Sequence, residues 1–188
     1  MSKFVVCCDM DNCLNNLIEQ MLKMYNDKYG TNYAQEDVHT YELEESFHLE
    51  EAEKMKELFL EKELWDNLVP VEKAQWGLQS LINRGYDVYI VTATHADNFA
   101  WKVAWIKKYF PFFDEKNIIR IHDKSLIAAD VLIEDCYANL VESRCFTERV
   151  LLDYPWNQSD KDWIFGINRA YNWEDVVRFV NKIYKGME

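Results

Sequence analysis

The sequence predicts an α/β fold in which a parallel sheet is flanked by helices and a small helical cap is inserted after the first strand. Short apolar runs, typical of buried strands, alternate with segments whose apolar residues recur every three or four positions. Strands that alternate with helices favour parallel pairing, because each helix carries the chain back along the sheet. Residues 14–68 contain only helical patterns and are longer than one crossover needs. We therefore expect a cap at 14–68 and a core domain built from 1–13 and 69–188.

The first strand and the two cap helices have clear patterns. Lys3–Cys8 is a β-branched and apolar run that stops at an acidic turn containing asparagine. Leu14–Tyr29 has helical apolar spacing and is followed by Gly30, a residue that commonly ends a helix. His48–Leu64 has the same spacing and predicts a second helix.

The rest of the chain, after Pro70, alternates helix and strand. The last strand is expected at Val150–Leu152. The expected order is helix Val71–Asn83, strand Tyr86–Val91, helix Asp97–Tyr109, strands Asn117–Ile121, Val131–Ile133 and Val150–Leu152, and helix Trp173–Tyr184.

Charge and hydropathy exclude several classes of partner. The chain has 21 Lys and Arg against 33 Asp and Glu, which gives a net charge of −12. This charge repels phosphate backbones and anionic lipids, so neither a nucleic-acid polymer nor a membrane is expected as a partner. The apolar runs are too short to span a bilayer, and Asp9 and Asp11 come too early for a signal peptide. We expect a cytoplasmic protein, and the sequence leaves a homodimer open.

Polar residues follow four of the expected strands where each strand ends. In an open parallel sheet, ligands bind outside the carboxyl ends of the strands, so these side chains are expected to meet at one edge. They are Asp9, Asp11, Thr92, Lys124, Glu134 and Asp135.

This set of residue types is suited to phosphoryl transfer. Clustered carboxylates repel one another unless a hard cation or a proton neutralises them, and oxygen ligands favour Mg²⁺. A lysine and a threonine hydroxyl can hold phosphate oxygens. Of two carboxylates two residues apart, one can attack phosphorus while the other handles the leaving-group proton. A purely structural alternative is that this turn caps the next helix through Asn12 or Asn15.

These residues resemble a known superfamily. Asp9-Met10-Asp11-Asn12-Cys13-Leu14 resembles the D-x-D-x-x-L motif of the haloacid dehalogenase superfamily, and Thr92, Lys124 and Glu134-Asp135 match its next three motifs in order. The segments Val-Thr-Ala-Thr-His (91–95) and His-Asp-Lys-Ser-Leu-Ile-Ala-Ala-Asp-Val-Leu-Ile-Glu-Asp (122–135) are similar to the 5'(3')-deoxyribonucleotidases of the cytosolic type C 5'-nucleotidase family. The resemblance implies a Rossmann-like core with the cap after the first motif.

The resemblance also implies catalytic and metal-binding roles. Asp9 would be the nucleophile and a ligand of Mg²⁺. Asp11 would be the general acid and base, with its backbone carbonyl on the metal. Asp135 would complete the metal site, with Glu134 behind it.

The implied substrate contacts are less uniform. Thr92 and Lys124 would hold the phosphate, and Ala93 stands where the family often has serine, so its side chain supplies no hydroxyl there. Asn12 stands where glycine is common, and asparagine is one of the few residues that tolerate left-handed backbone angles. Trp65 lies just before the end of the cap, where either a substrate contact or a core position fits.

The function implied is that of a Mg²⁺-dependent phosphomonoester hydrolase acting on nucleoside monophosphates through an aspartyl-phosphate, in particular a 5'(3')-deoxyribonucleotidase. An alternative is a phosphatase of the same superfamily acting on another small phosphomonoester, such as a sugar phosphate, because the cap determines the substrate. A non-catalytic receiver-like domain is disfavoured by the split pair Asp9 and Asp11 and by the long cap. A nucleotide-binding module without activity is disfavoured because both acids are present.

Overall fold

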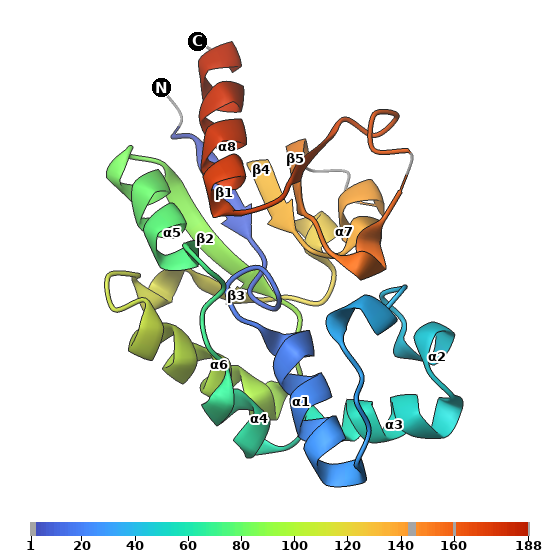
Figure 1. The fold of residues 1–188 in the computed structure, drawn as a ribbon. Helices are drawn as coiled ribbons and strands as arrows, with labels where there is room; N and C mark the ends of the chain where they lie inside the picture. Colours follow the sequence, from blue (N-terminus) through green and yellow to red (C-terminus); the bar gives the residue numbers. More distant parts are fainter. Residues whose placement is uncertain (1–2, 143–145, 160, 188) are drawn as a thin grey trace.

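The computed structural model describes residues 3–142, 146–159 and 161–187 of the 188-residue chain. Its centre is one sheet of six parallel strands in the order β3-β2-β1-β4-β5-β6 (Figure 1). The order reverses between β1 and β4, which is where open α/β sheets bind ligands. The strands are β1 (Val5–Cys8), β2 (Asp87–Thr92), β3 (Ile118–Arg120), β4 (Ala129–Glu134), β5 (Phe146–Leu152) and β6 (Ile167–Ala170).

Helices occupy most of the segments between the strands. No helix in the described ranges combines the length and the apolar character needed to cross a membrane. The α-helices are α1 (Leu17–Tyr29), α2 (Leu43–Ser46), α3 (Leu49–Leu58), α4 (Lys62–Asn67), α5 (Ala74–Asn83), α6 (Ala96–Tyr109), α7 (Tyr137–Glu142) and α8 (Trp173–Met187). Four single turns of 3-10 helix are η1 (Gln35–Asp37), η2 (Glu115–Asn117), η3 (Lys124–Leu126) and η4 (Pro155–Asn157).

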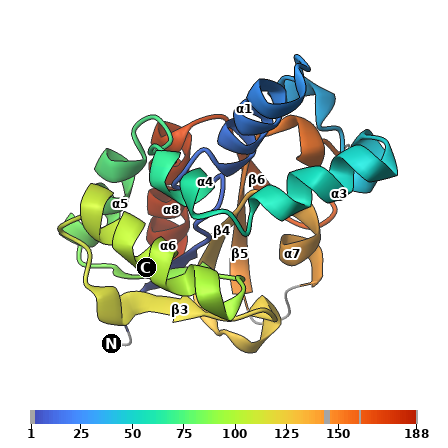
Figure 2. The same ribbon diagram turned by 90° about the horizontal axis from the view of Figure 1, so that it is seen from below.

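The core has two parts, one on each face of the sheet. Side chains of a strand alternate between the faces, so Val6 and Cys8 join the larger apolar cluster with α5 and α8, whereas Cys7 joins the smaller one. The smaller cluster includes Leu140 of α7, and Figure 2 shows α7 on the opposite side of the sheet from α5 and α8. Because both faces are buried, the central strands appear in the sequence as continuous apolar runs.

Helices α5 and α8 approach closely at a glycine. A Cβ atom built on Gly77 would lie 2.2 Å from the ring of Trp173, which is fully buried. The indole nitrogen of Trp173 donates to the carbonyl oxygen of Cys13, 2.9 Å away, in the turn after β1. Packing between these two helices therefore extends to the edge of the sheet where the polar residues lie.

Helices α1 to α4 gather beyond the carboxyl ends of the strands (Figure 1). The chain enters and leaves this helical layer at adjacent points, because Asn15 and Pro70 form an antiparallel bridge. Asn16 and Val69 reinforce the crossing with two hydrogen bonds, at 3.1 and 2.8 Å. The helical layer is thus connected to the sheet by two adjacent chain segments.

Two predicted elements were wrong. The expected helix His48–Leu64 is broken between α3 and α4, because the carbonyl oxygen of Phe59 accepts hydrogen bonds from the Trp65 indole and the Asn98 amide, both at 2.9 Å. Val150–Leu152 is a strand, the end of β5, but the last strand of the sheet is β6. Its sequence, Ile-Asn-Arg-Ala, was not recognised because β6 lies at the edge of the sheet and carries polar side chains.

Candidate active site

Asp9 follows β1 directly and stands at the centre of a polar cluster. Its backbone N–H donates to Ile133 of β4 at 2.9 Å, which continues the sheet pairing by one residue and fixes the backbone. The side chain is buried, and its Oδ2 accepts the N–H of Asp11 at 3.1 Å. Its other oxygen, Oδ1, lies 2.5 Å from the ammonium of Lys124.

The turn after Asp9 depends on two asparagines. Asn12 has φ of +55°, a left-handed backbone conformation that asparagine is one of the few residues to tolerate. Its Oδ1 accepts the N–H of Ile18 at 3.0 Å, while Oδ1 of Asn15 accepts the N–H of Leu17 at 3.1 Å. Asn12 and Asn15 thus accept the first two backbone N–H groups of α1, although the N-cap residue of that helix is Asn16.

Lys124, at the start of η3, is buried between two carboxylates. Its ammonium pairs with Asp9 and with Oε1 of Glu134. Burial alone would lower the pKa of this lysine, but the charges of Asp9 and Glu134 raise it well above its ordinary value. Lys124 is therefore held in the charged form beside Asp9.

The carboxylates at the end of β4 are deprived of water. Burial, assisted by the charge of Asp9, raises the pKa of Glu134 to about 7 even though Lys124 opposes the shift. Burial together with the charges of Asp9 and Glu134 raises the pKa of Asp135 well above its usual range. The site holds more negative charge than Lys124 can balance.

This excess of negative charge fits a divalent cation. One ligand atom each from Asp9, Cys13 and Asp135 lie within 4.8 Å of one another. Oδ2 of Asp135 accepts from Asn12 at 2.9 Å and from the Trp156 indole at 3.2 Å, which leaves Oδ1 for a cation. Burial raises the pKa of the Cys13 thiol well above normal, so the charged donors are oxygens. Asp9 and Asp135 thus form a candidate site for a divalent metal ion.

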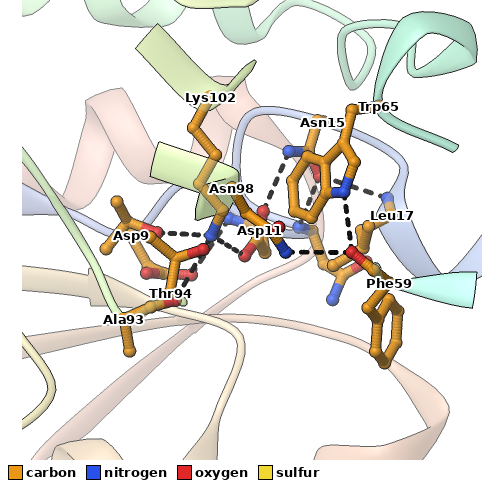
Figure 3. A network of polar contacts seen from close by, with 12 residues as sticks. Asp9, Asp11, Asn15, Leu17, Phe59, Trp65, Ala93, Thr94, Asn98 and Lys102 are labelled. Atoms are coloured by element: carbon orange, nitrogen blue, oxygen red, sulfur yellow. Dashed lines mark hydrogen bonds and ion pairs between the residues drawn. The ribbon is translucent and has the colours of Figure 1, made fainter. Parts of the chain in front are cut away.

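A second buried lysine, Lys102 of α6, points toward Asp11 (Figure 3). Its ammonium pairs with Oδ2 of Asp11 and donates to Oγ1 of Thr92 at 2.7 Å. This residue was not predicted, because it belongs to no sequence motif. Its spacing from Asn98 and Trp105 places it on the buried face of α6, which is an unusual position for a lysine.

A cavity of about 460 Å³ opens between the sheet edge and the helical layer. Its walls are mostly apolar side chains from 17–65, and its polar residues come from the sheet edge, from α6 and, in the helical layer, from Thr40, Glu42 and Lys56. Trp65 is buried, and its indole N–H donates to the carbonyl oxygen of Phe59, as expected for a core position. Its side chain also lines the cavity, where a substrate contact stays a prediction. The lining includes Asp11, Asn12, Leu17, Ile18, Val38, Leu43, Phe59, Trp65, Ala93, Lys102, Asp135 and Trp156.

The predicted site residues come together, in two layers. Asp11, Ala93, Trp65 and Asp135 line the cavity. The other three residues contact the lining residues or one another. Asp9 accepts a hydrogen bond from the N–H of Asp11, Thr92 accepts one from Lys102, and Lys124 forms an ion pair with Asp9.

The loop after β5 supports the candidate metal site through hydrogen bonds. Asn157 of η4 donates to the carbonyl oxygen of Asp135 at 2.7 Å, and the Tyr154 hydroxyl donates to that of Asn12 at 2.6 Å. Arg169 of β6 holds this loop through Oδ1 and the carbonyl oxygen of Asn157, both at 2.9 Å. The strand that the sequence analysis missed therefore helps to position Asp135.

Comparison with known proteins identifies related chains. The family model described as "5' nucleotidase, deoxy (Pyrimidine), cytosolic type C protein" matches residues 3–184. The chain is 31% identical over 176 residues to a 5'(3')-deoxyribonucleotidase from Clostridium acetobutylicum, covering 94% of both chains. It is 27% identical over 178 residues to a 5'(3')-deoxyribonucleotidase from Bacillus subtilis, covering 94% of this chain and 98% of the other.

Solved structures share the fold at low sequence identity. A haloacid dehalogenase-like protein from Agrobacterium tumefaciens superposes with a TM-score of 0.68 at 13% identity, covering 97% of this chain and all of the other. A haloacid dehalogenase family hydrolase from Deinococcus radiodurans, solved with phosphate and sodium, superposes with a TM-score of 0.64 at 13% identity, covering 97% of both chains. These two structures confirm the predicted fold class.

Proposed function

Because the chain belongs to the cytosolic type C 5'-nucleotidase family of the haloacid dehalogenase superfamily, we propose that it is a Mg²⁺-dependent phosphatase of nucleoside monophosphates, in particular deoxyribonucleotides. One observation supports this most directly. Asp9 and Asp11 follow the same central strand, with Lys124 and Asp135 beside Asp9 and an apolar cavity over Asp11. This arrangement combines a nucleophile, an acid, a phosphate-binding cation and room for a nucleoside.

Asp9 and Asp11 divide the chemistry between them. In the first step a carboxylate oxygen of Asp9 attacks phosphorus, the ester P–O bond breaks, and Asp11 gives its proton to the leaving oxygen. In the second step Asp11 takes a proton from water, whose oxygen attacks phosphorus and releases inorganic phosphate and the Asp9 carboxylate. The hydrogen bond from the Asp11 N–H to Asp9 Oδ2 fixes one oxygen of the nucleophile.

Phosphate contacts come from both sides of Asp9. Lys124 lies against Asp9 and supplies positive charge for the phosphoryl oxygens. Thr92 supplies a hydroxyl, and Ala93, which lines the cavity, offers backbone groups only. The side chain of Ala93 therefore supplies no hydrogen-bond donor to the phosphate.

The metal site has the ligands that Mg²⁺ prefers. The carboxylates of Asp9 and Asp135 would hold the ion together with the Asp11 backbone carbonyl, and Mg²⁺ commonly keeps its remaining positions for water and substrate phosphate. When bound, it would neutralise charge on the phosphoryl group. The excess negative charge around Asp9, Glu134 and Asp135 supports this assignment.

The helical layer is the proposed substrate-binding cap. We assign 14–68 to this cap and 1–13 with 69–188 to the catalytic core, and the paired chain crossings at Asn15 and Pro70 support that division. The cavity of about 460 Å³ is within the usual size range of small-ligand pockets. Its apolar walls suit the base and deoxyribose of a nucleotide better than the many hydroxyls of a sugar phosphate.

The direct test is hydrolysis by the purified protein, with Mg²⁺, of a panel of deoxyribonucleotides, ribonucleotides and sugar phosphates. We expect the highest kcat/KM with a deoxyribonucleotide and loss of activity with a chelator. Higher kcat/KM for a sugar phosphate than for every nucleotide would contradict the proposed substrate.

A second test addresses the nucleophile. Asp9→Asn should reduce kcat at least about 1,000-fold while the protein stays folded. Asp66→Asn is the matched control, because Asp66 is exposed and pairs only with Lys62 among the interactions seen. A wild-type rate for Asp9→Asn would refute the assignment.

A further inference from the structure

Lys102 is buried, and each N–H group of its ammonium has a hydrogen-bond acceptor within the protein. It is about 1% exposed, and its Nζ donates to Oδ2 of Asp11, to Oγ1 of Thr92 at 2.7 Å and to the carbonyl oxygen of Ala93 at 3.3 Å. An ammonium has three N–H donors, so all of them have partners. Two of these partners are residues assigned to the reaction.

The bond to Asp11 fixes which of its oxygens can exchange a proton. Lys102 holds Oδ2, whereas Oδ1 accepts only the amide of Asn15, at 3.1 Å, among the interactions of the described residues. A carboxyl oxygen has two lone pairs, so Oδ1 can accept from Asn15 and still carry or take a proton. Asp11 lines the cavity where the leaving group would sit.

The bond to Thr92 orients a hydroxyl. Since Oγ1 of Thr92 accepts from Lys102, the hydroxyl's own proton is free to point elsewhere. The same lysine therefore orients both the Asp11 carboxylate, whose Oδ1 would transfer a proton, and the Thr92 hydroxyl, which would donate to the phosphate.

Packing alone does not explain a lysine at this position. A buried charge is destabilising unless it is paired, and an apolar side chain of the same length would fill the same space. The ammonium also lies 5.2 Å from the centre of the Trp65 ring, in the helical layer. Figure 3 shows Lys102 reaching Asp11 from α6, with Trp65 and Asn98 close by.

We propose that Lys102 is a positioning residue: it holds the Asp11 carboxylate so that Oδ1 delivers the proton to the leaving oxygen, and it turns the Thr92 hydroxyl toward the phosphoryl group. The inference rests on the proposed function. In the step concerned, the Asp9–phosphorus bond forms, the phosphorus–ester oxygen bond breaks, and the proton of Asp11 moves to that oxygen.

The proposal predicts a dependence on the leaving group. A nucleoside leaves as a poor alkoxide that needs a proton, whereas nitrophenolate leaves from p-nitrophenyl phosphate without one. Lys102→Met should lower kcat/KM, which reports only the steps up to departure of the leaving group, by about 30- to 100-fold for a deoxyribonucleotide and by about 3-fold or less for p-nitrophenyl phosphate. The melting temperature should fall less than in Lys124→Met, because Asp11, the carboxylate that loses its cation, has a side chain that is 20% exposed. Lys102→Arg should recover part of the lost rate on the nucleotide.

Lys124→Met is the matched comparison, because Lys124 lies against the nucleophile and not the acid. It should lower kcat/KM for both substrates by similar factors. An equal fall for both substrates in Lys102→Met, or no fall in either, would overturn the proposal.

A double variant tests whether Lys102 acts through Asp11, because the effect of Lys102→Met on the rate can be compared in the presence and in the absence of the Asp11 carboxylate. If Lys102 acts through Asp11, Lys102→Met added to Asp11→Asn should cost less than about a further 3-fold in nucleotide kcat. A multiplicative loss would overturn the proposal. A wild-type protein that hydrolyses a sugar phosphate and no nucleotide would overturn the proposed substrate only. The same comparison would then be made between that sugar phosphate and p-nitrophenyl phosphate.

Discussion

The side-chain amide of Asn12 donates to Oδ2 of Asp135, 2.9 Å away, and so joins the turn after β1 to the end of β4. The two residues are 123 positions apart in the sequence. Asn12 also adopts the left-handed backbone conformation and accepts the N–H of Ile18. One residue thus shapes the turn that carries Asp9 and orients a carboxylate of the candidate metal site.

Substitutions of Asn12 separate these two roles. Asn12→Gly keeps the backbone conformation but removes the bond to Asp135, so the Mg²⁺ concentration for half-activation should rise about 10-fold or more. Asn12→Ala should show the same rise and, in addition, a free energy of unfolding about 1 kcal/mol below that of Asn12→Gly, because alanine is strained at positive φ. Metal titration of activity and urea unfolding measure the two effects. An unchanged half-activation concentration in both variants would contradict the positioning of Asp135.

Metal binding should appear in the stability of the protein. Mg²⁺ at about 100 times its dissociation constant should add about 2.7 kcal/mol to the free energy of unfolding. Asp135→Asn should abolish that increase, and without metal it should unfold at a higher temperature than wild type, since burial and neighbouring charges raise the pKa of Asp135. Thermal unfolding with Mg²⁺ and with a chelator tests this. Equal stabilisation of both proteins by Mg²⁺ would exclude Asp135 as a ligand.

Lys124 should be important for stability as well as for catalysis. Lys124→Met leaves Asp9 and Glu134 buried without their cation, so the free energy of unfolding in the absence of metal should fall by about 3–5 kcal/mol. Adding Glu134→Gln removes one of the unpaired charges and should restore part of the loss. Urea unfolding of both single variants and the double variant gives the coupling. Additive losses would show that Lys124 and Glu134 do not interact energetically.

The contact between α5 and α8 can be tested with glycine substitutions. Gly77→Ala places a methyl group against the rigid Trp173 ring. Overpacking of this kind commonly costs about 1–3 kcal/mol, whereas alanine gains about 1 kcal/mol over glycine in helix propensity. We therefore expect the free energy of unfolding to fall by up to about 2 kcal/mol. Gly186→Ala, in α8 with no atom within 4 Å of the added Cβ, is the control and should be neutral or slightly stabilising. A Gly77→Ala protein more stable than wild type would show that Trp173 has room to move. Because Trp173 bonds to Cys13, we also expect Gly77→Ala to lower kcat.

Elements with strong local patterns were predictable. The apolar runs of β1, β2 and β4 and the periodic helices α1, α5 and α8 lie close to their expected ranges. The break between α3 and α4 was not predictable, because it depends on the bonds of the Phe59 carbonyl to Trp65 and Asn98. Strand β6 was missed because its polar side chains, including Arg169, contact a loop instead of the core.

The sequence by itself determined the fold class, the family and the acidic residues that follow the strands, because each of these depends on a local pattern or on a short motif. Only the tertiary structure decided the partners of those residues: Lys102 pairs with Asp11, and the side chains of Asn12 and Trp156 donate hydrogen bonds to Asp135. It also decided that Trp65 is both buried in the core and part of the cavity wall. The physical reason is that a buried charge is stable only where opposite charges and hydrogen bonds meet it. These partners come from distant parts of the chain, and folding alone brings them together.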